Sequence, residues 1–429
     1  MSELVINPQT DLLAAPQGAD DVISSTQQSE CTKLDYFIMG LLIWSSGNPS
    51  FQLLLSNSQT TYIGLLFLLL ALNYRLLFLF SNSVQTFLIW GFFGGVAFFH
   101  IISGVPLRSE LGLLIRLSIA LVAAIRLHKY FAKLYLWWFL LLGKVSLVFW
   151  VLSLLGLLTS SSSIIVFICN LFGWPHGYLI FHTFHPYSVM RNCGIFWEPG
   201  AYAGYVLIAI LFLFSTSVKE HIKNYRFNLI MLLIVLLSTF STTGYIALFF
   251  ITMVYILRLF RKNSFLATAT LILFLSVSYY SYRNLDFLSG KITKETEAIN
   301  DEKRNWEMTR LGAMMVDYDY IREKPFWGWG NHYETIGASL ELKAGMGNGL
   351  SDFALKNGII SLLLWCYGCY CFAYMQLRKK AFAFLFLITC IVNLQGEIFL
   401  AYPVFLSFMF CGFILKADER KTSDSDGRA

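Results

Sequence analysis

Residues 201–218 read AYAGYVLIAILFLFSTSV, eighteen consecutive positions without a charged side chain. A run of this length and composition is typical of a helix that crosses a membrane, which needs about 20 mostly apolar residues. The whole chain has the same character, since 56% of its 429 residues are hydrophobic, 17% are aromatic and only 14% are charged. A soluble domain is about 25% charged. The composition therefore argues against a soluble enzyme, a secreted disulfide scaffold and a transcription factor.

Hydropathy divides the chain into spans rather than into domains. Helices are expected because backbone groups in lipid must satisfy their hydrogen bonds within the segment, and the alternating pattern of a membrane barrel is missing. We therefore predict an all-α polytopic membrane protein with about 12 transmembrane helices. Residues 130–143, with Trp137 and Trp138, are predicted as an interfacial helix that leads into the fifth span. The predicted spans are residues 35–55 (interrupted at Gly47-Asn48-Pro49), 61–80, 86–103, 111–127, 144–168, 201–218, 227–241, 244–260, 264–283, 351–377, 381–396 and 398–415.

Lysine and arginine gather on alternate connections between these spans, which indicates the orientation. Cytoplasmic loops of membrane proteins carry the excess of basic residues. The pattern predicts that both termini are cytoplasmic, with residues 1–33 as a disordered tail, 34–415 as the transmembrane domain and 416–429 as a short second tail. The residues that support this orientation are Arg126, Lys129, Lys133, Lys219, Lys223, Arg226, Arg258, Arg261, Lys262, Arg378, Lys379, Lys380, Lys416, Arg420 and Lys421.

Two long segments then lie outside the cytoplasm, at about residues 169–200 and 284–350. The second precedes the tenth span and holds eleven acidic and eight basic residues. Its aromatic residues, among them Trp306 and Trp327, argue for an ordered and partly helical cap rather than a solvated linker. Residues 291–310 are rich in helix formers and are predicted to be helical.

Several common chemistries find no support in this sequence. It has neither a phosphate-binding Walker motif nor a dinucleotide-binding glycine pattern. Cys366, Cys369 and Cys371 lie in an apolar span without a nearby histidine, which favours buried cysteines over metal ligands. The histidines at 176, 182 and 185 have no metal-ligand spacing, and we expect no metal, no cofactor and no nucleic-acid partner. Cys169 and Cys193 both fall near the outer face, where a disulfide is a minor alternative.

The candidates for catalysis or binding are polar residues at the outer ends of the spans. Arg116 lies a turn or two inside the fourth span, where a charge is costly unless it is paired or reaches the interface. Arg191 opens the run Arg-Asn-Cys-Gly-Ile-Phe-Trp-Glu-Pro-Gly before the sixth span. Arg310 opens a run that ends in Pro325-Phe326-Trp327-Gly328-Trp329-Gly330. Glu397 is a lone carboxylate between the last two spans.

These motifs resemble the O-antigen polymerase and ligase superfamily. The resemblance lies in the loop Arg-x2-Gly-x-Phe-x2-Pro from Arg191, and in the later arginine, Arg310, followed by Pro-x2-Gly-x-Gly and a glycine-containing helix start. The motifs occur in this order on twelve predicted spans, with one large outer loop before the tenth. Similarity at the level of residues is confined to about 185–205, 238–247, 305–335 and 345–365.

The resemblance implies a fold like that of the GT-C-type glycosyltransferases and a reaction on lipid-linked glycans. It implies transfer of sugar repeat units from undecaprenyl pyrophosphate on the periplasmic side of the bacterial inner membrane, without a metal or a nucleotide sugar. Implied partners are the donor and acceptor glycans, the bilayer and a chain-length regulator of the Wzz type. The product would enter lipopolysaccharide O-antigen biosynthesis.

The chemistry of this reaction suggests roles for the candidates. Arginine forks suit diphosphate oxygens, and Arg191, Arg310 and Arg116 are the available forks. A base must accept the proton of the acceptor hydroxyl, and Glu198, His332 and Asp352 are open alternatives. An ion pair on the loop surface is the structural alternative for Arg310 and Glu198. Trp327 and Trp329 are predicted either to stack on sugar rings or to anchor the loop at the membrane interface.

Two departures from the ligase pattern favour a Wzy-type polymerase. Ligases of this superfamily carry a histidine where the outer loop re-enters the membrane, and the corresponding residue here is Asn348. They also carry an arginine after a serine near the seventh span, where this chain reads Ser241-Thr242-Thr243-Gly244-Tyr245. A ligase remains the main alternative. A transporter is the alternative from another class, although the halves of the chain show no convincing repeat.

Overall fold

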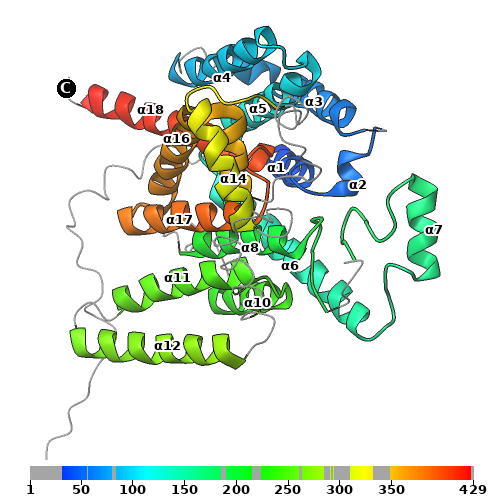
Figure 1. Ribbon diagram of the computed structural model, residues 1–429, viewed down its shortest axis with the longest axis vertical. Helices are drawn as coiled ribbons and strands as arrows, with labels where there is room; N and C mark the ends of the chain where they lie inside the picture. Colours follow the sequence, from blue (N-terminus) through cyan, green and yellow to red (C-terminus); the bar gives the residue numbers. More distant parts are fainter. Residues whose placement is uncertain are drawn as a thin grey trace, which may run out of the picture.

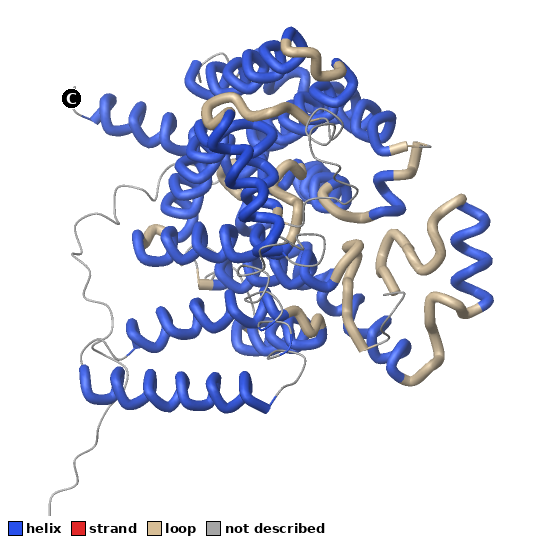
Figure 2. Tube along the Cα trace, viewed as in Figure 1, coloured by secondary structure: helices blue, strands red, loops and turns tan. Residues whose placement is uncertain are grey.

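The computed structural model describes residues 31–55, 57–79, 84–184, 190–214, 224–259, 263–284, 310–331 and 348–426, with single positions at 290 and 293. In these residues the regular elements are helices, and two isolated β-bridges join Tyr178 to Thr183 and Phe184 to Asn192. Figures 1 and 2 show the helices packed beside one another. The predicted all-α polytopic membrane fold is confirmed.

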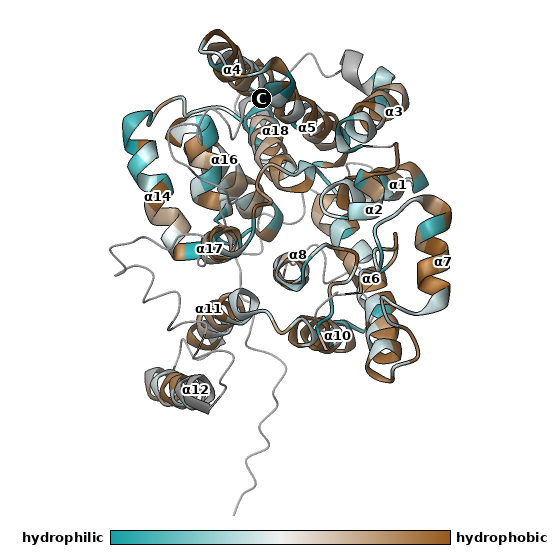
Figure 3. Ribbon diagram, turned by 45° about the vertical axis from the view of Figure 1, so that its right-hand side comes forward, coloured by the Kyte–Doolittle hydropathy of each residue, from teal (hydrophilic) through white to brown (hydrophobic). Residues whose placement is uncertain are grey.

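The charge-free run at residues 201–218 belongs to the most buried helix of the described chain. Helix α8 spans Pro199–Leu213, and each of its fifteen residues is buried. It contacts α6 (Phe131–Leu154), α10 (Tyr225–Ser238), α11 (Thr242–Leu259) and α17 (Lys380–Gly396), which surround it in Figure 3. A helix that is apolar on all sides is expected inside a bundle. Its N-terminus carries Glu198, so the most buried helix also fixes one of the candidate site residues.

A second group of helices packs beside the group that surrounds α8. It contains α3 (Ser58–Leu79), α4 (Val84–Ile102), α5 (Leu107–Leu127), α16 (Gly349–Leu377) and α18 (Pro403–Asp426). Gly368 of α16 and Gly412 of α18 let the two backbones touch, because a Cβ at Gly412 would lie 1.9 Å from the carbonyl oxygen of Gly368. Small residues commonly allow such close helix crossings in membranes.

The remaining elements are peripheral or short. They are α1 (Lys33–Ser45), α2 (Pro49–Gln52), α7 (Ser163–Phe172), α12 (Ser264–Asn284) and α14 (Arg310–Glu323). Within the described residues, α4, α6 and α16 are long and apolar enough to cross a membrane by themselves. Shorter apolar helices lie at Ser163–Phe172, Pro199–Leu213, Tyr225–Ser238, Thr242–Leu257 and Lys380–Gly396.

Three predicted segments have different boundaries in the structure. The predicted interfacial helix at 130–143 and the first part of the predicted span at 144–168 form one continuous helix, α6, so the interfacial assignment is wrong. Helix α6 ends before Gly156, which has a left-handed φ of 69°, and the serine-rich turn that follows separates it from α7. The span predicted at 35–55 is a 13-residue helix and a single turn, because Asn48 and Pro49 start a new helix. Helix α18 continues to Asp426, so most of the predicted C-terminal tail is helical.

Basic residues from distant parts of the chain meet at one end of the bundle. Arg126 pairs with Asp35 at 2.5 Å, and His128 lies 3.3 Å from Asp418. The side chain of Gln376 donates to the backbone oxygen of His128 at 2.9 Å. Helix α17 begins here at Lys380 and ends at Gly396, next to Glu397, so the candidate site lies at the opposite end of the helix.

The segment Pro325–Gly330 lies directly on a kink in α16. Gly358 has non-helical backbone angles (φ 82°, ψ 161°), and a Cβ there would lie 1.9 Å from the oxygen of Phe326. The backbone N–H groups of Trp329 and Gly330 donate to the oxygens of Leu355 and Lys356, at 2.9 and 3.0 Å. The loop segment thus satisfies carbonyls that the kink leaves without helical partners.

Candidate functional site

Arg310 and two carboxylates form an ion cluster at one end of the central helices. The Nη2 atom of Arg310 lies 3.3 Å from Glu198 Oε1 and 3.1 Å from Glu397 Oε1. Arg310 is the first residue of α14, Glu198 precedes α8, and Glu397 follows α17. Glu198 lies 112 positions before Arg310 in the chain, and Glu397 lies 87 positions after it. The tertiary structure therefore brings the three residues together.

The two carboxylates of this cluster differ in their exposure to solvent. The side chain of Glu397 is 5% exposed, whereas that of Glu198 is 37% exposed. The Nη2 atom of Arg310 contacts both carboxylates. Glu198 is consequently the carboxylate that an incoming molecule can reach more easily.

Glycines make the room that this cluster needs. A Cβ at Gly200 would lie 2.2 Å from Glu397 Oε1, and one at Gly396 would lie 3.1 Å from Arg310 Nη1. A Cβ at Gly349 would lie 2.1 Å from the backbone oxygen of Glu397. A side chain at Gly200 would displace the carboxylate of Glu397, one at Gly396 would crowd the guanidinium, and one at Gly349 would displace the backbone of Glu397.

The ion cluster lines a cavity of about 440 Å³. Trp197, Ile398 and Tyr402 complete much of its wall. One arginine faces two carboxylates here, so the described lining has an excess of negative charge. We call this space the Arg310 cavity.

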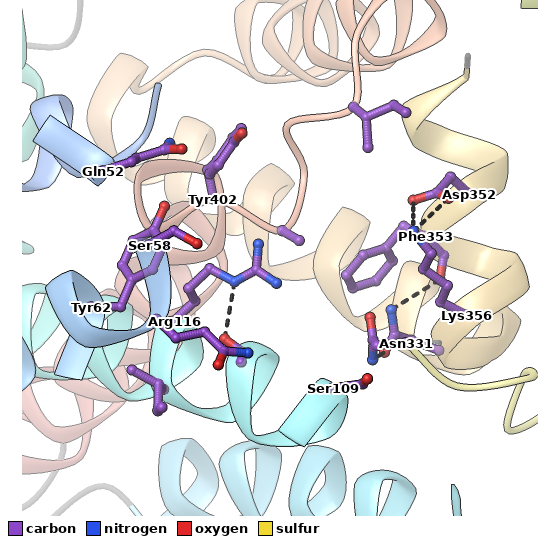
Figure 4. Close-up of a pocket in the computed structure, with 16 residues that line it drawn as sticks. Gln52, Ser58, Tyr62, Ser109, Arg116, Asn331, Asp352, Phe353, Lys356 and Tyr402 are labelled. Atoms are coloured by element: carbon purple, nitrogen blue, oxygen red, sulfur yellow. Dashed lines mark hydrogen bonds and ion pairs between the residues drawn. The ribbon is translucent and has the colours of Figure 1, made fainter. Parts of the chain in front are cut away.

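A second cavity, of about 450 Å³, surrounds Arg116. In Figure 4 the side chain of Arg116 points into the space between Tyr402 and Phe353. Asp352 and Lys356 lie across it and pair with each other at 2.7 Å. Ile398 and Tyr402 line both cavities, so the two spaces are neighbours. We call this space the Arg116 cavity.

Arg191 lies outside both cavities. Its Nε donates to the backbone oxygen of Thr239 and its Nη2 to that of Phe240, both at 3.3 Å. Asn192, next to it, donates to the hydroxyl of Ser238 at 3.0 Å. The loop that the sequence motif describes is thereby fixed to the C-terminal end of α10. The structure does not bring Arg191 into the Arg310 cluster.

Asn348 and Asp352 both lie at the start of α16. Asn348 caps the helix, because its Oδ1 accepts from the N–H groups of Leu350 and Ser351 at 3.1 and 3.2 Å. Its amide donates to Gln395 at 2.5 Å. Asp352 pairs with Lys356 at 2.7 Å and lines the cavity around Arg116 rather than the one beside Arg310.

A buried carboxylate that the sequence did not mark lies beside them. Asp317 of α14 is fully buried and accepts a hydrogen bond from the Ser351 hydroxyl. Burial raises the pKa of Asp317 to about 7, and the nearby charge of Asp352 adds to the effect. It sits between α14 and α16 and is absent from the linings described for both cavities.

The two tryptophans of the outer loop make contacts within the protein. Trp327 packs between Phe92 and Phe99, with ring centroids at 6.2 and 6.0 Å. The indole N–H of Trp329 donates to the oxygen of Tyr320, and Lys324 lies 3.8 Å from the centre of its ring. Neither lines the Arg310 cavity or the Arg116 cavity. His332 and residues 291–309, apart from position 293, lie outside the described residues.

Two further expectations concern cysteines and metals. Cys169 and Cys193 are buried free thiols, so the suggested disulfide is wrong. No group of three or more His, Cys, Asp or Glu side chains in the described ranges is placed to hold a metal ion.

Residues 227–366 match the family model Wzy_C, O-antigen ligase. The match includes Arg310, Asp317, Asp352 and the loop segment on the kink of α16, whereas Glu198 and Glu397 lie outside it. It supports the O-antigen polymerase and ligase superfamily for this chain without separating polymerase from ligase. A search of curated proteins found no match.

Glu397 is the site residue that sequence reasoning left without a role. Its signal was visible, since it is a single carboxylate between two apolar spans and follows Gly396. The sequence does not give the distance between Glu397 and Arg310, because that distance depends on how α14 packs against α17. The same packing joins Glu198 to the cluster.

Proposed function

We propose that this protein transfers glycans between lipid-linked substrates at the outer face of the bacterial inner membrane, as a Wzy-type O-antigen polymerase. The observation that carries the proposal is the cluster of Arg310 with Glu198 and Glu397, at the end of the bundle opposite the basic residues. The family match, which concerns glycosyl transfer on lipid-linked glycans, supports it. The donor is taken to be a glycan on undecaprenyl pyrophosphate, and a Wzz-type regulator and cytoplasmic termini are part of the same proposal.

The proposed reaction exchanges one bond at the anomeric carbon of the donor. The bond from that carbon to the diphosphate oxygen breaks, and its electron pair leaves with the diphosphate. The acceptor hydroxyl forms the new glycosidic bond and loses its proton to a carboxylate. A preorganised cation near the departing diphosphate oxygen stabilises the negative charge that develops there.

The geometry favours Glu198 as the base. It is the more exposed carboxylate of the cluster, and its Oε1 atom lies 3.3 Å from Arg310 Nη2. Glu397 is buried against Gly200 and contacts the same Nη2 atom of Arg310 as Glu198 does. We therefore assign Glu397 and Arg310 the role of positioning Glu198 and of balancing its charge.

The environment of Asn348 supports polymerase over ligase. The position where related ligases carry a histidine is here a helix cap with its oxygen and amide both bonded, and an amide cannot exchange protons at neutral pH. The description of the matched family favours the ligase reaction instead. Deletion of the gene separates the two, because loss of a polymerase leaves core bearing one repeat unit, whereas loss of a ligase leaves bare core and lipid-linked polymer.

The residues are tested by complementing the deletion strain and analysing its glycans on gels. We expect Glu198→Gln, Glu397→Gln and Arg310→Ala to reduce the polymer at least tenfold at equal membrane abundance. Gly200→Ala should have a similar effect, since its Cβ would displace Glu397. Gly91→Ala is the matched control, because a Cβ there meets nothing within 4 Å. Full-length ladders from the Glu198 and Glu397 variants would refute the assignment.

A further inference from the structure

The described linings of the two neighbouring cavities differ in the sign of their charge. In the Arg310 cavity one cation faces two carboxylates. In the Arg116 cavity two cations, Arg116 and Lys356, face the single carboxylate of Asp352. We propose that the Arg116 cavity binds the diphosphate of a lipid-linked glycan, while the Arg310 cavity holds the reacting sugar and the base.

Arg116 has donors available for an anionic ligand. Its Nε donates to the backbone oxygen of Gly112 at 3.0 Å, which aims the two terminal amino groups into the cavity. No carboxylate in the described part of the chain lies within ion-pair distance of Arg116, and the Tyr62 ring is 6.0 Å away. A half-buried guanidinium in a membrane helix is costly without a counter-charge. A diphosphate supplies that charge and matches the planar fork.

The rest of the lining suits a phosphate and its attached sugar. Carboxamides at Gln52, Gln59, Asn331 and Asn357 and hydroxyls at Ser58 and Ser109 offer neutral donors and acceptors. Lys356, on the opposite wall, is balanced by Asp352, which leaves Arg116 as the unbalanced charge. The described lining would therefore attract an anion, and its neutral polar groups would orient the sugar attached to that anion.

The position of the cavity fits the proposed reaction. Because Ile398 and Tyr402 line both cavities, one substrate can extend from Arg116 to the carboxylates. The diphosphate that leaves with the electron pair of the broken bond then remains at Arg116. The acceptor proton passes to Glu198 in the adjacent space, where a second negative group would be repelled by the carboxylates. This inference rests on the proposed function, whose residues lie in the other cavity.

The inference is tested by binding of farnesyl diphosphate to the purified protein in phosphatidylcholine nanodiscs. Farnesol, which lacks the diphosphate, measures partitioning of the chain alone. We expect the diphosphate to bind the wild-type protein, with Arg116→Gln weakening binding at least tenfold and Arg116→Lys weakening it less. Arg310→Gln should change the affinity less than twofold.

A second variant fills the cavity and keeps the arginine. Gly112 lines the cavity, and the nearest atom to a Cβ there is Gln59 Nε2 at 3.9 Å, so Gly112→Leu should fold and occupy the space. Gly95→Leu, on the adjacent helix α4 where a Cβ meets nothing within 4 Å, is the matched control. We expect the first to abolish binding and the second to leave it unchanged.

The outcomes separate this inference from the proposed function. Loss of binding in Arg310→Gln with retention in Arg116→Gln would overturn it and place the diphosphate in the Arg310 cavity. Equal binding of farnesol and farnesyl diphosphate by the wild type would also overturn it. The proposed function fails on a different measurement, the glycan ladder of the Glu198 and Glu397 variants.

Discussion

Single residues decide the chemistry of this site through their burial. Glu397 is almost completely buried, so its charge depends on Arg310 for compensation. Removing one partner of a buried ion pair costs about 3–5 kcal/mol, more than removing both. For this reason Glu397→Gln, which keeps shape and hydrogen bonding, tests function more cleanly than Arg310→Ala does.

Asp317 gives a prediction about pH. Burial raises its pKa from 3.8 to about 7 in the folded protein. The folded state therefore binds more protons than the unfolded state between these values, and its free energy of unfolding falls as pH rises, by at most ~1.4 kcal/mol per pH unit. We expect Asp317→Asn to remove this part of the pH dependence, so that the variant gains stability relative to wild type from pH 5 to pH 8.

The measurement is the thermal unfolding midpoint in detergent across that range. Asp319→Asn is the control, because Asp319 lies on the same helix but is only partly buried. Parallel pH profiles for wild type and Asp317→Asn would contradict the prediction.

At the scale of elements, the kink of α16 depends on the outer loop. The backbone of Pro325–Gly330 donates hydrogen bonds to carbonyls on one side of the kink. Gly328 and Gly358 allow this loop segment and the backbone of α16 to touch. Both glycines have left-handed φ angles, 76° and 82°, that other residues rarely adopt. The motif that resembles the superfamily therefore has a structural reason: it holds α16 bent at the cavity wall that carries Asp352 and Lys356.

We expect Gly358→Ala to destabilise the protein strongly, because its Cβ would lie inside the backbone of Phe326. Gly328→Ala should have a similar effect through its contact with Lys356. Membrane abundance and the thermal midpoint are the readouts, and Gly95→Ala on α4 is the control in open space. Normal abundance of the Gly358 variant would show that the loop does not pack on the kink as described.

For the whole molecule, the separation of charge between the two ends predicts the orientation. Arg126, His128 and Arg378 gather at one end and the Glu198–Arg310–Glu397 cluster lies at the other. We expect a cysteine at Ser103, which is exposed near the outer end of α4, to react with an impermeant maleimide in intact spheroplasts. A cysteine at Lys421, near the end of α18, should react only after lysis.

This experiment uses a variant in which Cys31 and Cys366, the partly exposed thiols among the described residues, are replaced by serine. Labelling of the Lys421 site in intact spheroplasts together with protection of the Ser103 site would reverse the orientation. That result would also contradict the proposed reaction at the periplasmic face.

Composition and hydropathy alone were sufficient to predict the membrane fold class and most of the helices, because in lipid every span must be apolar and satisfy its own backbone. The prediction was least accurate where single turn residues act: Gly156 ends α6 and Asn48 starts α2, while a hydropathy window averages over both. Local motifs also identified Arg310 and Glu198 as candidates, since charged residues in so apolar a chain are few. Only the tertiary structure shows that Arg310 and Glu198 form a cluster with Glu397. It also shows that Arg191 bonds to the end of α10 and that two cavities lie side by side. These features depend on distances between helices far apart in the chain, and packing rather than local sequence sets such distances.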